Sequence, residues 1–291
     1  MQIVEARVAS VAGLPVRRVL PSRARRKVGP FVFLDEMGPT EFAPGEGIDV
    51  PPHPHIGLST LTYLLEGGID HRDSTGAFQP IRPGAVNWMT AGRGVTHSER
   101  ADPADRARGG AMQGVQAWVA LPPESEEIEP SFEHHPAESL PMERVGAVKI
   151  SLLAGEAFGL TSPVRVHSPL FYVDARWESD GGLELDPALG ERAVYPLDGS
   201  VEVGGERIER GQLATAADDG EELTVVGAAG ARVLLLGGPR REAPVFMHWN
   251  YVASTEERIA EAKVRWANGG FPAVVGDGGP GAVAPLAPPG G

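Results

Sequence analysis

Four side chains in this sequence have the types and the spacing of metal ligands. One residue separates His53 from His55, and further along the chain one residue separates His97 from Glu99. Residues i and i+2 of a β-strand point to the same face, so each pair offers two ligands in one direction. If the two strands are neighbours, three imidazoles and one carboxylate converge. The alternative is that the histidines cap a turn and fill a core, and two such pairs in strand-like surroundings argue against it.

This donor set restricts the metal and its chemistry. Imidazoles with a carboxylate suit Fe(II), Mn(II), Ni(II) or Cu(II) better than a tetrahedral structural zinc. Three neutral imidazoles and one carboxylate leave a divalent ion with a single net positive charge. Four protein ligands on an octahedral ion leave two positions open for a bidentate oxygen ligand, or for substrate and dioxygen. The set therefore favours a catalytic centre over a structural ion.

The elements that must position these residues are strands. Short runs of alternating and β-branched residues are separated by Gly and Pro, which number 38 and 27. Such spacing is typical of antiparallel sandwiches or barrels. The clearest predicted strands are Leu58–Leu65, Met112–Leu121, Val148–Leu153 and Leu170–Trp177. Two hairpins are also predicted, from Tyr195–Leu197 to Ser200–Val203 across Asp198-Gly199, and from Leu223–Val226 to Arg232–Leu236.

One helix is predicted near the C-terminus. Ser254 and Glu257 have the spacing of a capping box, and a Gly-Gly pair follows to end the helix. Ile259, Val264 and Trp266 supply its apolar face. After the helix, the chain becomes rich in Gly and Pro and is expected to have little fixed structure.

Length and composition exclude several classes of protein. A chain of 291 residues allows about two domains of roughly 150 residues. The absence of Cys excludes disulfides, iron–sulfur clusters and thiol catalysis. A net charge of −13 disfavours direct binding of nucleic acid. No apolar run is long enough to span a membrane, and Met1–Glu5 does not begin a signal peptide, so we expect a cytoplasmic protein without a membrane anchor.

The residues around the two ligand pairs resemble the two motifs of the cupin superfamily. The first motif is formed by Gly47, His53, His55, Thr60 and Gly67. Thr60 stands where cupins usually have a glutamate ligand. The second motif is Gly92-Arg93-Gly94-Val95-Thr96-His97, with Glu99 two residues later. A first motif without the glutamate, followed by a second motif with one after its histidine, is similar to the pirin family in particular.

Other segments extend this resemblance over about residues 1–276. They include 16–23, 28–35, 63–67, 71–74 and 89–94 in the first half, and 167–169, 237–239 and 268–271 in the second. The sequence departs from the family pattern at Glu36, where pirins often have histidine. It departs again at the C-terminus, where a Gly/Pro-rich stretch replaces the usual ending.

The resemblance implies an all-β bicupin. Two antiparallel, jelly-roll-like β-barrel domains are expected, with the C-terminal helix packing on the N-terminal domain. The expected ranges are 1–130 for the metal-binding cupin, 131–145 for a linker, 146–275 for a metal-free cupin and 276–291 for a tail. The resemblance also implies one Fe(II) ion, or Mn, Ni, Cu or Zn in its place, held by His53, His55, His97 and Glu99.

The resemblance implies two functions. Some pirins are quercetin 2,3-dioxygenases, so the first expectation is an enzyme that cleaves a small aromatic substrate such as a flavonol, with Glu99 as the catalytic base. Other pirins are transcriptional co-regulators or partners of metabolic enzymes. The alternative is therefore a non-enzymatic, redox-responsive regulator that binds proteins. Because two barrels of one chain already cover each other's apolar faces, a monomer is expected.

The remaining polar residues leave open alternatives. His71 and Asp73 alternate on a predicted strand, where they would either orient a metal ligand or form a salt link with Arg72 or Arg93. The basic residues at 23–27 fit a solvated loop better than an anion site. The other histidines are interpreted as surface, turn or hydrogen-bonded residues; they are His134, His135, His167 and His248.

Overall fold

The computed structural model describes residues 1–216, 220 and 222–279. The described chain forms two compact units, each built from three segments. Unit 1 contains Met1–Arg7, Arg17–Leu34 and His135–Glu242. Unit 2 contains Val8–Val16, Asp35–His134 and the chain from Ala243 onward. The units therefore interleave along the chain, whereas the sequence-based ranges run one after the other. The chain passes from one unit to the other several times, because an N-terminal strand joins a sheet of unit 1 and the C-terminal helix belongs to unit 2.

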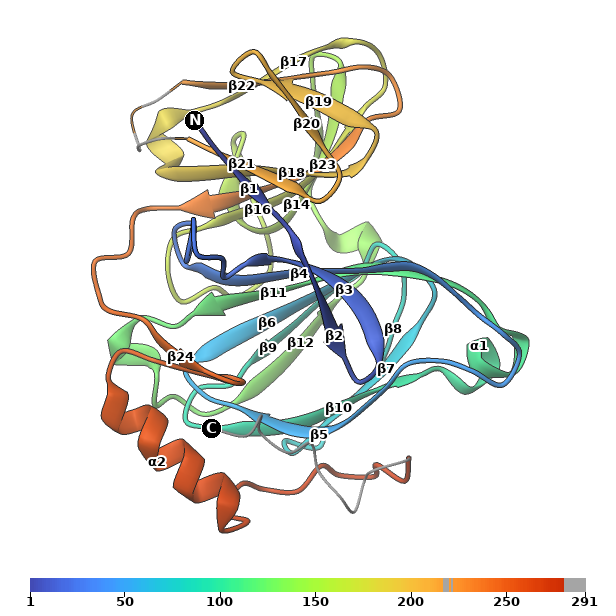
Figure 1. The fold of residues 1–291 in the computed structure, drawn as a ribbon, viewed down its shortest axis with the longest axis vertical. Helices are drawn as coiled ribbons and strands as arrows, with labels where there is room; N and C mark the ends of the chain where they lie inside the picture. Colours follow the sequence, from blue (N-terminus) through green and yellow to red (C-terminus); the bar gives the residue numbers. More distant parts are fainter. Residues whose placement is uncertain (217–219, 221, 280–291) are drawn as a thin grey trace. The chain divides into compact units, whose positions relative to one another are not determined.

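Most residues of two sheets and of one hairpin belong to unit 2 (Figure 1). The first sheet has seven strands in the order β12 (Ser131–His135), β9 (Val86–Thr90), β6 (Leu58–Glu66), β11 (Gly110–Ala120), β4 (Phe31–Phe42), β3 (Leu14–Leu20) and β2 (Arg7–Val11). The second has four strands in the order β5 (Asp49–His55), β10 (Val95–Ala101), β7 (Ile69–Asp73) and β8 (Phe78–Ile81). The predicted strands at Leu58–Leu65 and Met112–Leu121 are confirmed as β6 and β11.

Apolar side chains from both sheets of unit 2 meet in one core. Met37 and Leu64 from the seven-stranded sheet pack with Val50, Ile69 and Ile81 from the four-stranded sheet. Successive side chains of a strand point to opposite faces of its sheet, so each sheet has one apolar face, and the sandwich buries the apolar faces of both sheets. The metal-ligand candidates lie on the four-stranded sheet of this sandwich.

The C-terminal segment of unit 2 adds a hairpin and a helix. The hairpin pairs β24 (Phe246–His248) with β25 (Tyr251–Ala253), and helix α2 (Glu256–Ala267) follows. The helix and the hairpin share an apolar cluster with Ile56, which directly follows β5. The expected packing of the C-terminal helix on the metal-binding domain is thus confirmed.

The details of α2 differ from the prediction. Thr255 is the N-cap and its side chain accepts a hydrogen bond from the Arg258 N–H, so the capping box on Ser254 is wrong. The Ser254 hydroxyl is instead 3.0 Å from a carboxylate oxygen of Glu126. Val264 is exposed, and Ile259 with Ala262 forms the buried face.

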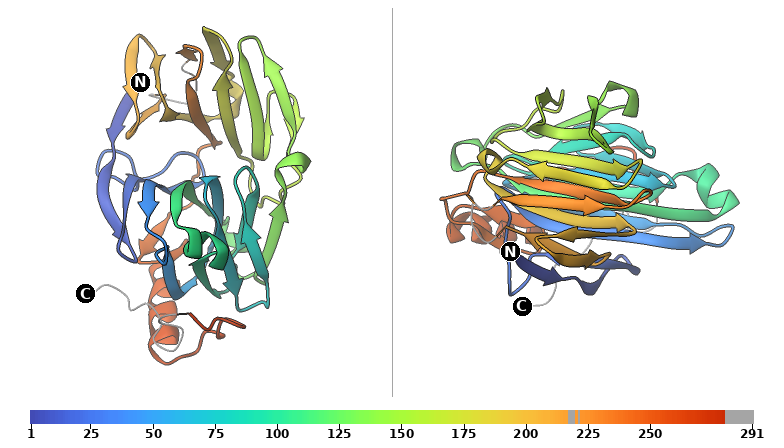
Figure 2. Two further views of the ribbon diagram at one scale, coloured as in Figure 1. Left: turned by 90° about the vertical axis from the view of Figure 1, so that its right-hand side faces the viewer. Right: turned by 90° about the horizontal axis from the view of Figure 1, so that it is seen from above.

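Unit 1 is a second sandwich (Figure 2). Its larger sheet has the order β1 (Gln2–Glu5), β21 (Gln212–Thr215), β18 (Glu191–Asp198), β23 (Arg232–Gly238), β16 (Phe171–Trp177), β14 (Val148–Ala157) and β13 (Met142–Val145), and β15 (Leu160–Thr161) pairs with β14. Its smaller sheet has the order β17 (Gly181–Leu185), β22 (Leu223–Gly227), β19 (Ser200–Val203) and β20 (Glu206–Glu209). Side chains such as Phe171, Leu183 and Val225 form the core between these sheets. Two antiparallel sandwiches in one chain confirm the bicupin prediction.

Both predicted hairpins of unit 1 are wrong. β18 and β19 flank Asp198-Gly199, but β18 pairs with β21 and β23, whereas β19 pairs with β20 and β22. β22 and β23 likewise belong to different sheets. An Asp-Gly dipeptide specifies a tight turn, but in a sandwich the chain turns from one sheet into the other as readily as back along the same sheet.

Two segments have more structure than the sequence suggests. The range 131–145, expected as a linker, contains β12 and β13, which each lie at the edge of a sheet. In the expected tail, the Asp277 carboxylate is buried and pairs with the Arg100 guanidinium at 2.9 Å. Residues 280–291 of that tail lie outside the described residues.

The helices are few and short. Besides α2, the described residues contain α1 (Pro103–Arg108) and three 3₁₀ turns at Pro123–Ser125, Ala137–Ser139 and Pro187–Leu189. No helix of this described part is long and apolar enough to cross a bilayer.

Candidate metal centre

The first two candidate ligands lie on an edge strand. β5 is the outermost strand of the four-stranded sheet, which explains why it tolerates Pro51, Pro52 and Pro54, residues that cannot donate a hydrogen bond to a neighbour. The register of β5 against β10 shifts opposite the segment between His97 and Glu99, at the two adjacent prolines. Beyond this bulge, His53 and His55 alternate regularly and point to one face.

The third candidate enters from a glycine turn. β9 and β10 are joined by residues 91–94, where Gly92 has a φ of +49°. A Cβ at Gly92 would lie 2.0 Å from the Ile128 carbonyl oxygen, so this turn requires glycine. The turn sets the register of β10, in which His97 is directly opposite His53. The neighbouring antiparallel strands assumed in the sequence analysis are therefore present.

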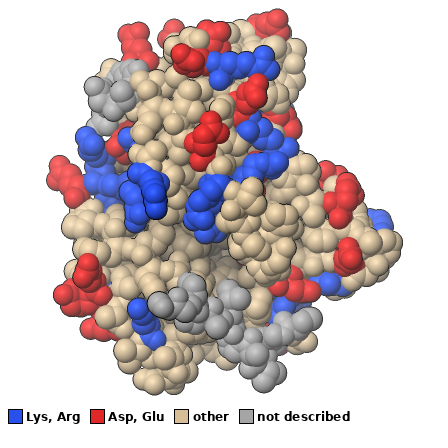
Figure 3. Space-filling model, viewed as in Figure 1, with Lys and Arg blue, Asp and Glu red and all other residues tan. Residues whose placement is uncertain are grey.

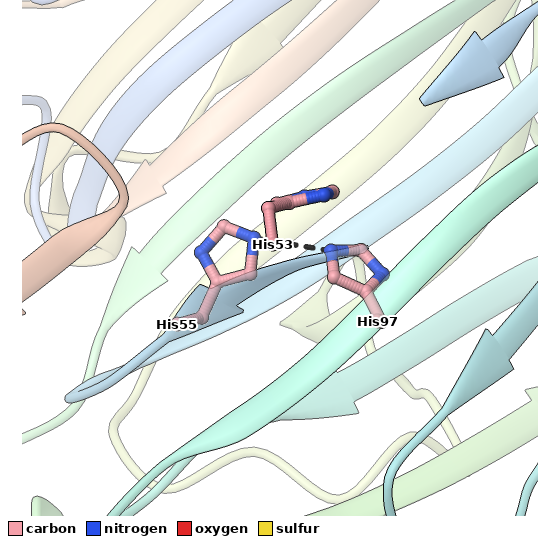
Figure 4. Close-up of side chains that lie close together, drawn as sticks. All are labelled: His53, His55 and His97. Atoms are coloured by element: carbon pink, nitrogen blue, oxygen red, sulfur yellow. Dashed lines mark hydrogen bonds between the residues drawn. The ribbon is translucent and has the colours of Figure 1, made fainter. Parts of the chain in front are cut away.

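The three histidines converge inside the sandwich (Figure 4). One ring nitrogen from each of His53, His55 and His97 lies within 4.8 Å of the others, and all three side chains are buried. The Nε2 atoms of His55 and His97 are 3.1 Å apart. Within the described residues, this is the one group of three or more side chains with the geometry to hold a metal ion.

The protonation of the rings suits a metal. The Nδ1 atom of His53 is 2.9 Å from the Pro51 carbonyl oxygen, and the Nδ1 atom of His55 is 3.0 Å from the Asn250 carbonyl oxygen. A carbonyl only accepts, so each Nδ1 carries the proton and each Nε2 keeps its lone pair. Burial lowers the pKa of His53 to about 4 and holds the pKa of His55 and of His97 well below the usual range, so all three are neutral near pH 7.

The distances also fit a shared ion. Two nitrogens bound to one metal at about 2.1 Å lie about 3.0 Å apart at a right angle and about 3.4 Å apart at the tetrahedral angle. The separation of 3.1 Å between the His55 and His97 Nε2 atoms falls in this range. Without a bridging cation, converging lone pairs of buried imidazoles repel one another. The donor set therefore fits a transition metal.

Glu99 lies next to this group but is not within it. It is two residues beyond His97 on β10 and is 8% exposed. Burial raises the pKa of the Glu99 carboxyl to about 7, against a smaller lowering by a hydrogen bond from Thr62. The Thr62 hydroxyl is also 2.8 Å from the side-chain oxygen of Gln116. The role of Glu99 as a fourth ligand remains a prediction.

Sequence reasoning missed the residues that hold these side chains. Thr62 and Gln116 lie on β6 and β11, opposite each other in the seven-stranded sheet, and their pattern there is that of ordinary strand residues. The Asn250 carbonyl belongs to the turn between β24 and β25 and is far from His55 in the sequence. Any residue can supply a backbone carbonyl group, so the sequence gives no sign of this contact. Trp118 packs its ring edgewise against His55, with ring centres 5.1 Å apart.

The structure excludes one of the two alternatives for His71 and Asp73, the salt link with Arg72 or Arg93. The two side chains pair with each other at 3.0 Å. The neighbouring arginines have other partners, since Arg72 lies 3.6 Å from Asp70 and Arg93 lies 2.7 Å from Glu129. His71 and Asp73 thus pair with each other on β7, the strand next to the one that carries His97 and Glu99.

The basic residues at 23–27 are partly paired. The Arg25 guanidinium lies 3.1 Å from the Glu191 carboxylate, and the Lys27 ammonium donates to the Arg241 carbonyl oxygen. Acidic and basic side chains are both spread over the face drawn in Figure 3. His134, expected to be solvated, is instead half-buried, with its Nδ1 2.7 Å from the Asn87 side-chain oxygen.

A β-sandwich with three buried imidazoles on neighbouring antiparallel strands defines a protein of the cupin class. Comparison with family models then gives the particular group: the model "Pirin" matches residues 13–119 and the model "Pirin C-terminal cupin domain" matches residues 172–272. The chain belongs to the pirin family.

Its relatives cover nearly the whole chain. A pirin-like protein of Caulobacter vibrioides is 51% identical over 92% of this chain and 93% of its own length. Human pirin is 31% identical over 88% of this chain and 87% of its own length. A crystal structure of quercetin 2,3-dioxygenase from Acinetobacter baumannii superposes with a TM-score of 0.91 at 37% identity, covering 99% of this chain and 94% of that one.

Proposed function

We propose that the chain is a mononuclear Fe(II) dioxygenase that cleaves flavonols such as quercetin, with the iron held by His53, His55, His97 and Glu99. The observation that carries this proposal is the buried group of three neutral imidazoles with converging lone pairs. The similarity to a quercetin 2,3-dioxygenase of known structure supports the choice of substrate class. Bound iron would supply a Lewis acid for the flavonol oxygens and a route for activating dioxygen.

The chain's own residues would bind and deprotonate the substrate. Glu99 is buried beside the histidines, and burial raises the pKa of its carboxyl to about 7 in the metal-free site, so its carboxylate is a stronger base than that of an exposed glutamate. It would accept the proton of the flavonol 3-hydroxyl group. Thr62 would then hold the Glu99 carboxyl in place while it is protonated. Dioxygen would add to C2 and C4 of the deprotonated flavonol, and cleavage of the C2–C3 and C3–C4 bonds would release C3 as carbon monoxide. The depside would remain, and the proton held by Glu99 would return to its carboxylate.

Aromatic side chains lie beside the histidines. Trp118 lies against His55, and Phe132 stacks on His71 with ring centres 4.3 Å apart. Aromatic neighbours of this kind are typical of sites that bind flat, largely apolar ligands.

Dioxygen uptake tests the proposal. Protein loaded anaerobically with Fe(II) is mixed with quercetin and air-saturated buffer, and the rate is expressed per bound iron. We expect turnover above that of free iron, with one carbon monoxide released per dioxygen consumed. The His97→Ala variant, which lacks one of the three imidazoles, should lose this activity. Equal rates for wild type, variant and free iron would contradict the proposal.

A further inference from the structure

A buried histidine–carboxylate pair lies directly behind one of the candidate ligands. His71 and Asp73 are on β7, the neighbour of β10, with Asp73 opposite His97 and His71 opposite Glu99. The His71 Nε2 atom is 3.0 Å from an Asp73 carboxylate oxygen, and the side chains are 4% and 0% exposed. On its other side, the His71 Nδ1 atom is 3.4 Å from the His97 Nδ1 atom. Asp73, His71 and His97 thus form a continuous chain.

The protons of this chain can be assigned from its hydrogen bonds. The second oxygen of Asp73 accepts from the Thr75 N–H at 2.8 Å, the Thr75 hydroxyl at 2.6 Å and the Ala77 N–H at 3.2 Å. A carboxyl group whose two oxygens accept four bonds is an ionised acceptor. The His71 Nε2 atom therefore donates to Asp73. The His97 Nε2 atom faces the His55 Nε2 atom at 3.1 Å, so it is the atom that would hold the metal, and the proton of His97 is then on Nδ1. The His97 Nδ1–H donates to the His71 Nδ1 atom.

His97 thus differs from the other two histidines. The rings of His53 and His55 are oriented by the neutral carbonyl groups of Pro51 and Asn250. The ring of His97 is oriented by an imidazole that is itself bonded to a carboxylate. Such a partner makes a ligand imidazole more basic than a carbonyl does, because negative charge reaches the ring through the hydrogen bonds.

We propose that His71, held by Asp73, is a positioning residue of the metal centre that fixes His97 with Nε2 facing the metal and makes it the strongest electron donor of the three imidazoles. The inference rests on the proposed metal centre, not on the identity of its substrate. A stronger donor stabilises Fe(III) more than Fe(II) and so lowers the reduction potential of the site. Phe132, stacked on His71, keeps the His71 ring from turning away.

Near-isosteric substitutions separate this role from a structural one. Asp73→Asn keeps the size of the side chain and one oxygen for the Thr75 turn, but it removes the charge and replaces the oxygen that accepts from His71 with an NH2 group. His71→Phe keeps the stack on Phe132 but removes the acceptor for His97. Asp70→Asn is the matched control, because Asp70 is equally buried on the same strand and pairs with Arg72 instead of a histidine.

The readouts are the Co(II) dissociation constant, measured against a competing chelator, and the Fe(III)/Fe(II) midpoint potential. We expect Asp73→Asn and His71→Phe to bind Co(II) about 10- to 100-fold more weakly than wild type. The potential of both variants should be higher, while Asp70→Asn matches wild type in both measurements. Wild-type affinity and potential in Asp73→Asn and His71→Phe would overturn the inference.

The same experiment keeps the two proposals apart. Wild-type protein that binds metal but consumes no dioxygen with quercetin contradicts the dioxygenase function, and the affinities and potentials still decide the role of His71. Wild-type protein that binds no Co(II) or Fe(II) overturns both, because no metal centre then exists for His71 to position.

Discussion

Replacing Glu99 with glutamine should change the number of protons released when the metal binds. The carboxyl group has a pKa of about 7 in the metal-free protein. At pH 6 it is therefore about 90% protonated and at pH 8 about 10%. A metal needs the carboxylate form, so binding to Glu99 should release about 0.9 proton at pH 6 and about 0.1 at pH 8. The apparent affinity of wild type should therefore rise about tenfold from pH 6 to pH 8.

The histidines should contribute almost nothing to this count. Burial lowers the pKa of His53 to about 4 and holds the pKa values of His55 and His97 well below their usual range. All three rings are therefore already neutral when the metal binds. Three ordinary imidazoles would instead release about 2.3 protons at pH 6. Glu99→Gln, which cannot lose a proton, should therefore release close to none and should bind with an affinity that hardly changes between pH 6 and 8.

Calorimetric titration with Co(II) in two buffers of different ionisation enthalpy measures the released protons directly. Equal release from wild type and Glu99→Gln would show that Glu99 does not bind the metal. Release of two or more protons at pH 6 from wild type would show that the histidines are not the neutral, buried groups described above. Either result would refute the reasoning.

Three further predictions concern stability and the turns that hold the site. Because the pKa of Glu99 is raised, the folded metal-free protein binds more protons than the unfolded chain between about pH 4.5 and 7, and its free energy of unfolding should fall by about 3 kcal/mol as the pH rises through that window. Urea unfolding should show this fall in wild type relative to Glu99→Gln, since the histidines titrate alike in both proteins. Parallel pH profiles of the two proteins would contradict the prediction. Asp277→Ala leaves the Arg100 guanidinium buried without its bidentate partner and should cost about 3 kcal/mol in denaturant unfolding, whereas an unchanged midpoint would show that the 275–279 segment is not anchored. Gly92→Ala places a Cβ against the Ile128 carbonyl in a left-handed turn and should weaken Co(II) binding by displacing β10, while Gly76→Ala, also left-handed but with nothing near its Cβ, should leave Co(II) binding unchanged.

The convergence of the three histidines is predictable from the sequence because the information for it is local. The two pairs His53/His55 and His97/Glu99 each fix a shared face by strand alternation, and only the pairing of β5 with β10 must be supplied by the fold. The groups that orient these side chains are not local. Asn250 contributes a backbone carbonyl, and Thr62 contributes one of many strand hydroxyls, so neither carries a recognisable pattern.

The fold class is predicted for the same reason, and the strand pairing is not. Alternation identifies strands such as β6 and β16, and a turn signal such as Asp198-Gly199 identifies where the chain reverses. Which strand becomes the neighbour depends on tertiary packing. Here the turn between β18 and β19 and the turn between β22 and β23 each lead from one sheet into the other. Asp277 shows the same limit, because a single aspartate in a Gly/Pro-rich stretch gives no sign of the Arg100 guanidinium that it contacts.

The measurement that tests the metal centre most directly is anomalous diffraction from crystals prepared anaerobically with Fe(II). We expect one strong peak at the iron edge in unit 2. The iron ion at this peak should be bound by the Nε2 atoms of His53, His55 and His97 and by a carboxylate oxygen of Glu99. No such peak, or an iron that is bound away from the three imidazoles, would contradict the account.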